Sequence, residues 1–259
     1  MKESNSAMTA IPNRGNLFVG TSGWSYQHWS GCFYPPEIPP SRYLEYYITH
    51  FACVELNASF YHLPFKTTVA GWMRRTQDSF RFCTKMSRFI THQKRLVNCD
   101  EALENYFQTF DYLKPKLGPV LVQLPPNFHC DRELFIHFAE LLKNRHPDYR
   151  FAVEIRDGSW INDDFFDLLS SYSIGFVISD TGGKFPFAEI VTTDFVYIRF
   201  HGREQLYASD YTTPDLVLFA EKICCWLNEG KDVWAFFNND YEGFAPKNAL
   251  KLRELVYLQ

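Results

Sequence analysis

Short apolar runs recur along the chain, each rich in Val, Ile, Phe and Tyr and bounded by turn residues. Runs of roughly four to eight such residues are typical of β-strands. The pattern predicts eight strands, at residues 16–20, 51–57, 80–85, 119–124, 151–155, 175–180, 195–200 and 232–237.

Apolar residues at helical spacing fill most of the stretches between these strands. Helices are predicted at residues 40–50, 98–113, 131–144, 162–172, 213–230 and 246–255. Asp131 is expected to cap the helix that it begins, and Thr213 with Pro214 to start the helix that ends at Gly230. The stretch 181–194 has little helical pattern.

Eight strands joined mostly by helices fit a closed parallel barrel, because a parallel neighbour needs a long crossover connection. We therefore expect an α/β fold, a (β/α)8 TIM-type barrel formed by residues 16–259 as a single domain, with an irregular connection between the sixth and seventh strands. An open doubly wound sheet is the alternative. Residues 1–15 are expected to be a flexible N-terminal segment.

Nearly every predicted strand is apolar at its start and polar at its end. The polar residues at these ends are Glu55, Asn57, Lys85, Gln123, Glu154, Arg156, Asp180, Tyr197, Arg199, His201, Asn238, Asn239 and Asp240. In a barrel the carboxyl ends of the strands meet at one mouth, where catalytic residues of this fold lie. These side chains are therefore expected to converge.

The stretch FAVEIRD, residues 151–157, allows two interpretations of that convergence. Glu154 and Arg156 lie two apart, so on a strand they face the same side. They could be one of two ion pairs, with Glu55–Lys85 as the other, that seal the barrel end. Buried ion pairs often stabilise no better than apolar residues of similar volume. We therefore favour a functional site built on rigid strands.

Two loops add candidate binding groups. Trp24 and Tyr26 follow the first strand and could stack on a sugar or a base, or cap the core. The basic loop 88–95, which contains Arg88, His92, Lys94 and Arg95, could bind phosphate or carboxylate, or be a solvated face.

Charge and motifs narrow the function classes. The formal net charge is −4, so the electrostatic footprint of a general nucleic-acid binder is missing. The seven cysteines have no metal-like spacing, and neither a signal peptide nor a membrane span is evident, so a reducing, cytoplasmic setting is expected. His201 could ligate a metal, but the arginines and lysines at the strand ends favour an anion. No metal and no cofactor are expected.

We hypothesise an enzyme, a metal-independent hydrolase, lyase or isomerase, that acts on a small anionic substrate. Glu154 would be the general base and His201 the acid, with Glu55 and Lys85 as further catalytic candidates. The substrate-binding candidates are Trp24, Asn57, Gln123, Arg156, Asp180, Arg199, Asn238 and Asn239.

Two other mechanisms stay open. Lys85 near an arginine could have a lowered pKa and form a Schiff base. Glu55 and Glu154 could be a glycosidase pair, although the surrounding cations would keep both ionised.

Six segments together resemble the YecE-like family, known as domain of unknown function 72. They are VELNASFYHLP, RFCTKMSRFITH, VLVQLPPNF, FAVEIRDGSW, YIRFHG and FFNNDYEGFAPKNA, and the match runs in order from about Val19 to Leu250. The chain departs from the typical pattern at Ala58 and Ser59, where members have Thr, and at Asp157, where they tend to have His. The resemblance implies a TIM barrel, adds Tyr61 to the substrate-binding candidates and implies no specific activity.

Two further functions remain as alternatives. A nucleic-acid enzyme or binder, like metal-dependent endonuclease barrels, would use Trp24, Tyr26 and the loop 88–95, but the net charge disfavours it. A non-catalytic ligand-binding protein would use the same mouth. The sequence favours no membrane partner and leaves the oligomeric state open.

Overall fold

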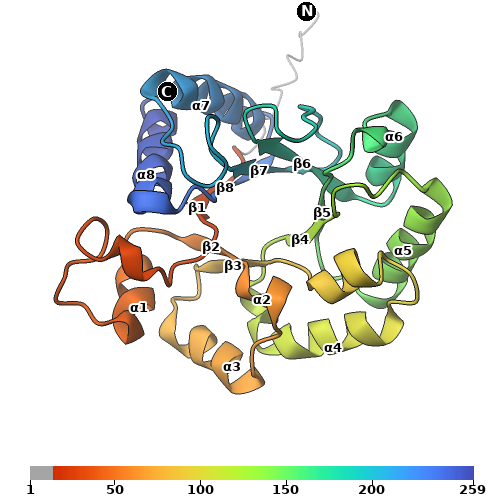
Figure 1. The fold of residues 1–259 in the computed structure, drawn as a ribbon, viewed down its shortest axis with the longest axis horizontal. Helices are drawn as coiled ribbons and strands as arrows, with labels where there is room; N and C mark the ends of the chain where they lie inside the picture. The colour runs from red at the N-terminus through yellow and green to blue at the C-terminus, as the bar shows by residue number, and fades with distance from the viewer. Residues whose placement is uncertain (1–13) are drawn as a thin grey trace, which may run out of the picture.

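The computed structural model describes residues 14–259, in which eight parallel strands form a ring (Figure 1). The strands are β1 (Leu17–Thr21), β2 (Cys53–Leu56), β3 (Arg81–Thr84), β4 (Val120–Gln123), β5 (Phe151–Glu154), β6 (Ile174–Asp180), β7 (Phe195–Phe200) and β8 (Asp232–Phe237). Each strand begins and ends within about two residues of its predicted bounds, which is the usual disagreement at element ends.

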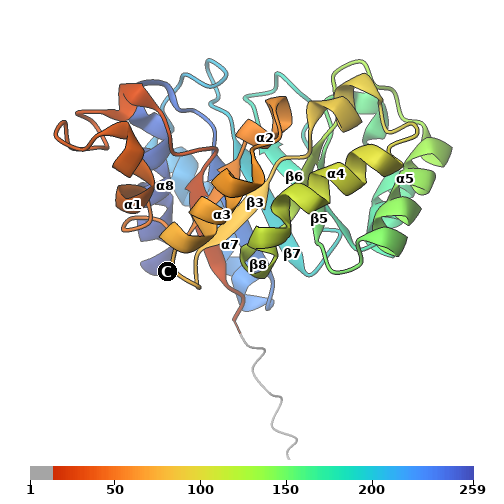
Figure 2. The same cartoon turned by 90° about the horizontal axis from the view of Figure 1, so that it is seen from below.

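Helices surround the ring, and α2 lies at the end where the strands finish (Figure 2). They are α1 (Tyr43–Tyr47), α2 (Ala58–Tyr61), α3 (Lys66–Arg75), α4 (Asp100–Phe110), α5 (Arg132–Arg145), α6 (Asp163–Ser171), α7 (Thr213–Asn228) and α8 (Phe244–Tyr257). All six predicted helices are present. Helices α2 and α3 were not predicted, and α3 buries only Val69, so its apolar stripe is too short to recognise.

The helix starts show one confirmed and one wrong prediction. Asp131 caps α5 by accepting from the Leu134 backbone N–H at 3.0 Å. The cap of α7 is Thr212, not Thr213, because Asp215 three residues later completes a reciprocal capping box with Thr212.

Two other expectations concern less regular segments. Neither a helix nor a strand lies between β6 and β7, as predicted. The segment 1–15 was expected to be flexible, and its residues 1–13 lie outside the described part of the chain. Gly15 lies within the described part, and its backbone N–H donates to the Leu227 carbonyl at 2.8 Å. In the described part of the chain, no helix is long and apolar enough to cross a membrane.

The ring closes in chain order, which excludes the open doubly wound sheet. Hydrogen-bonded parallel pairs join the strands in the order β1-β8-β7-β6-β5-β4, and β2 pairs with β3. Parallel bridges at Phe82–Leu117 and Lys85–Leu121 join β3 to β4. The remaining neighbours, β1 and β2, lie against each other.

A tyrosine side chain joins β1 to β2. The hydroxyl of Tyr47, on α1, accepts from the Thr21 backbone N–H at 3.0 Å and donates to the Cys53 carbonyl at 3.1 Å. Gly20 allows this close approach, because a Cβ atom there would lie 2.4 Å from the Cys53 oxygen. The phenol therefore replaces direct backbone pairing at this one seam.

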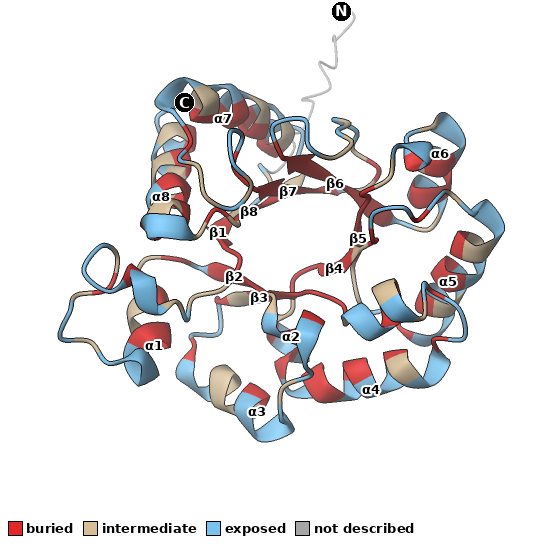
Figure 3. Ribbon diagram, viewed as in Figure 1, coloured by how far each residue is buried: buried red, intermediate tan, exposed pale blue. Residues whose placement is uncertain are grey.

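The strands are largely buried (Figure 3), and side chains fill the inside of the ring. The inward-facing layer consists of Cys53, Cys83, Leu121, Ala152, Val177, Phe195, Tyr197, Trp234 and Phe236. Strand side chains alternate between faces, so the residues two positions later also point inward, at the carboxyl end. Those residues include Glu55, Lys85, Gln123, Glu154 and Arg199.

Candidate active site

Arg199, on β7, lies at the centre of the charged mouth. Its Nε and Nη2 donate to both oxygens of Glu55 at 2.9 and 2.7 Å, and its Nη1 donates to Glu154 Oε2 at 2.5 Å. None of these three side chains has exposed surface. A planar guanidinium is suited to bridging two carboxylates, so β2, β5 and β7 are joined at their ends.

Further donors saturate Glu55. Its oxygens also accept from Ser22 Oγ at 2.6 Å and from Tyr197 Oη at 2.8 Å. Burial would raise the pKa of Glu55, but the Arg199 charge and the hydrogen bonds from Arg199 and Ser22 hold it below the ordinary value. Glu55 is therefore ionised at neutral pH.

Glu154, like Glu55, is held by several donors besides Arg199. It forms an ion pair with Arg156 and accepts from Ser179 Oγ at 3.2 Å. Burial would raise its pKa, but Arg156 and Arg199 lower that pKa well below the ordinary value. Two permanently ionised carboxylates provide no general acid, so the site does not suit a glycosidase pair.

His201 follows β7 and is fully buried beside Glu154. Its Nε2 lies 3.4 Å from Glu154 Oε1 and 3.2 Å from Arg156 Nη2, and its Nδ1 lies 3.1 Å from the Asn238 amide nitrogen. Burial and the Arg199 charge lower its pKa to about 4, although Glu154 opposes the shift. The ring is therefore neutral at neutral pH.

Lys85, at the end of β3, is only 8% exposed. Its Nζ donates to Gln123 Oε1 at 2.8 Å and lies 4.0 Å from the centre of the Phe60 ring. Burial and the Arg199 charge lower its pKa to about 7, against the opposing effect of both glutamates. Lys85 is thus close to half protonated at neutral pH.

The charges explain this shift. Arg156 and Arg199 already balance Glu55 and Glu154, so a protonated Lys85 adds one uncompensated positive charge to a buried site. The expected Glu55–Lys85 ion pair does not form, because Arg199 occupies both Glu55 oxygens.

Arg156 has unused hydrogen-bonding capacity. Its Nε and Nη1 are buried and have no hydrogen-bond partner within residues 14–259. The Phe185 ring, from the connection between β6 and β7, lies 4.2 Å from its Cζ. Asn57 Oδ1 is a second buried atom of the mouth that lacks a partner there.

Four other candidates contribute differently. Tyr61 is 62% exposed at the end of α2. Asp180 binds Arg203 Nε at 2.9 Å, outside the central cluster. Asn239 donates to Ser209 O and Asn248 Oδ1 at 2.9 and 2.8 Å, so it faces α8, whereas Asn238 contacts His201.

Trp24 lies beside the mouth. Its ring packs edge-on against Trp72, with the ring centres 5.5 Å apart. Trp24 lines a cavity of about 260 Å³ together with Ser22 and Asn57. This cavity adjoins the Glu55 network through Ser22.

Some site residues had not been selected from the sequence. Ser22 and Ser179 bind the two glutamates, but serines at strand ends carry no distinctive pattern. His92 is half-buried, and burial together with the Lys85 and Arg88 charges lowers its pKa to about 4. The sequence had indicated His92 only as a member of the basic loop 88–95, and not by itself.

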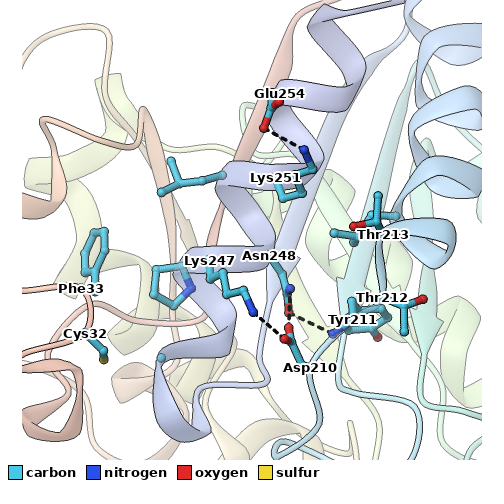
Figure 4. Close-up of a pocket in the computed structure, with 14 residues that line it drawn as sticks. Cys32, Phe33, Asp210, Tyr211, Thr212, Thr213, Lys247, Asn248, Lys251 and Glu254 are labelled. Atoms are coloured by element: carbon cyan, nitrogen blue, oxygen red, sulfur yellow. Dashed lines mark hydrogen bonds and ion pairs between the residues drawn. The ribbon is translucent and has the colours of Figure 1, made fainter.

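A larger cavity, of about 760 Å³, lies away from the charged cluster, between α8 and the start of α7 (Figure 4). Its polar side chains bind each other: Lys247 pairs with Asp210 at 2.7 Å and Lys251 with Glu254 at 3.1 Å. Size alone therefore does not identify it as the site. Within the described range, no cluster of three or more His, Cys, Asp or Glu could hold a metal ion.

Comparison with known proteins gives a consistent result. The family described as "Protein of unknown function DUF72" matches residues 18–259. "UPF0759 protein YunF" of Bacillus subtilis is 28% identical over 94% of this chain and 95% of its own, and "UPF0759 protein YecE" of Escherichia coli is 33% identical over 54% and 48%. The crystal structure of a DUF72 family protein from Thermotoga maritima superposes with a TM-score of 0.85, at 32% identity, over 93% of this chain and 99% of that one.

Proposed function

The chain belongs to the DUF72 family, and we propose that it is an enzyme that binds a small anionic substrate at the carboxyl-terminal mouth of its barrel. The single observation that carries this proposal is Arg156, whose Nε and Nη1 are buried without an acceptor in the described structure. An unsatisfied buried donor on a charged group is costly. A carboxylate or phosphate oxygen would satisfy it.

The charge balance supports the same ligand. The two arginines and two glutamates sum to zero, and a protonated Lys85 makes the site positive. A bound anion would compensate that charge. The free donors of Arg156 are buried, so a small molecule suits them better than the backbone of a nucleic acid.

The roles follow from the pKa directions. Lys85, with a pKa lowered to about 7 by burial and the Arg199 charge, is the group able to exchange a proton near neutral pH. Glu154 holds Arg156 in place through their ion pair, and the neutral His201 ring contacts Arg156 beside Glu154. Asn57, through its free Oδ1, would accept from a substrate hydroxyl.

Ligand-induced stabilisation tests the proposal. Phosphate or pyruvate should raise the melting temperature of the wild type, by the equivalent of about 1.4 kcal/mol at ten times the dissociation constant. Arg156→Gln should abolish the shift. Arg75→Gln is the matched control, because Arg75 forms an exposed ion pair with Glu45 and should leave the shift intact. An unshifted wild type, or equal shifts in wild type and Arg156→Gln, would refute anion binding at this site.

A further inference from the structure

We infer that Lys85 forms an imine with the carbonyl group of a substrate whose anionic group binds Arg156. This inference rests on the proposed function and narrows its substrate to an anionic carbonyl compound, such as a 2-oxo acid. The observations that carry it are the surroundings of two buried lysines, Lys85 and Lys116.

Lys116 shows how this fold satisfies a buried ammonium. Its Nζ donates to the carbonyls of Met73 and Thr76 at 3.1 and 2.8 Å and lies 3.6 Å from Asp78 Oδ1. A carboxylate and two carbonyl oxygens stabilise its positive charge. Lys116 lies in the 3-10 turn before β4 and contacts α3, outside the ring of strands.

Lys85 has a much poorer set of partners. One neutral amide oxygen, from Gln123, accepts from its Nζ, and the Phe60 ring lies on another side. Burial and the charges of Arg199 and Arg156 oppose its protonation, and they outweigh Glu154 and Glu55, which favour it. A buried lysine next to arginines is a setting in which an amine acts as a nucleophile.

The step balances without a further reagent. The Lys85 nitrogen pair forms a C–N bond to the carbonyl carbon, and the carbonyl π pair moves to oxygen, which takes one amine proton. The second N–H proton then leaves with that oxygen as water while the C=N bond forms. No atom is oxidised or reduced, and the anionic group of the substrate remains on Arg156.

An imine restricts the reaction class. Once protonated on nitrogen, the imine draws electrons from the carbon next to its C=N carbon, which favours bond cleavage or proton transfer at that neighbouring carbon. Among hydrolases, lyases and isomerases, this chemistry selects a lyase or an isomerase.

Reductive trapping tests the inference. Pyruvate with sodium cyanoborohydride at pH 7 should give one adduct on the peptide that contains Lys85, with the mass of pyruvic acid less one oxygen atom. At that pH Lys85 has about a thousandfold more neutral amine than an ordinary lysine. Lys85→Met should lose the adduct, and Lys184→Met should keep it, because Lys184 donates to the Arg203 and Glu204 carbonyls at the surface.

Arg156→Gln tests anion binding by Arg156 separately from imine formation by Lys85. It should slow labelling by pyruvate about tenfold more than labelling by uncharged acetone, because acetone has no anionic group for Arg156 and reports only a change in the Lys85 amine itself. Labelling spread over many lysines, or undiminished in Lys85→Met, would overturn the imine. If phosphate still stabilises the wild type through Arg156 in that case, the proposed anion site stands and only the imine fails.

Discussion

Glu154 shows at the residue scale how the mouth combines stability with function. The side chain has no exposed surface and pairs with two arginines. Glu154→Gln leaves a buried positive charge without its partner, so it should lower the free energy of unfolding by about 3–5 kcal/mol. Urea unfolding measures the change.

Glu45→Gln is the matched control, because Glu45 and Arg75 form an ion pair with more than a third of each side chain exposed. Exposed pairs of this kind contribute about 0–1 kcal/mol. Equal losses in the two variants would show that the Glu154 network is not closed to water.

Lys85, unlike Glu154, lowers the stability of the folded protein at neutral pH. Burial and the Arg199 charge lower its pKa from 10.5 to about 7, so the unfolded chain binds more protons between those pH values. Stability from this group is present above pH 10.5 and is lost as pH falls to 7. Lys85→Met should therefore be more stable than the wild type at pH 7, and its advantage should shrink by about 2 kcal/mol at pH 9. Urea unfolding at both pH values tests this, and an advantage that does not change with pH would contradict it.

Site residues were predictable where strand phase decides their direction. Glu55, Lys85, Gln123, Glu154 and Arg199 follow inward-facing residues by two positions, and all converge. The phase of a strand does not determine, however, which residue each side chain contacts. Asp180 and Asn239 are examples. Asp180 binds Arg203, from the loop after β7, and Asn239 donates to Asn248 on α8.

At the scale of elements, the seam between β1 and β2 depends on one hydroxyl. Tyr47→Phe removes it and leaves the Thr21 N–H and the Cys53 carbonyl without a partner inside the protein. We expect a loss of about 1–3 kcal/mol in the free energy of unfolding and faster hydrogen exchange at the Thr21 amide. Tyr46→Phe, on the same helix, is the control, because Tyr46 makes neither bond. An unchanged Thr21 exchange rate in Tyr47→Phe would rule out this role.

Elements were predictable where their apolar pattern is long. The strands and the six predicted helices each bury several apolar residues, whereas α3 buries only Val69 and α2 is a single turn. The cap of α7 was misplaced by one residue because adjacent threonines, Thr212 and Thr213, are both good caps, and only the partner Asp215 distinguishes them.

At the scale of the whole molecule, His201 makes stability depend on pH. Burial and the Arg199 charge lower its pKa from 6.5 to about 4, so the unfolded state binds more protons between these values. Stability from this group is full above pH 6.5 and is lost as pH falls towards 4. The wild type should lose about 2 kcal/mol between pH 7 and pH 5 through this residue.

Denaturant unfolding at the two pH values checks this loss. His201→Asn should show a smaller decrease, and His137→Asn should behave as the wild type, because the His137 side chain is 78% exposed. A full decrease in His201→Asn would assign the pH dependence to other groups.

The phenol at the seam also has a consequence between molecules. A closed ring offers no strand whose backbone groups can recruit another copy, whereas an open sheet has two such strands. If the Tyr47 link opens, β1 and β2 become those strands, and chains could pair edge to edge and aggregate. A single aromatic hydroxyl would then protect this protein from self-association.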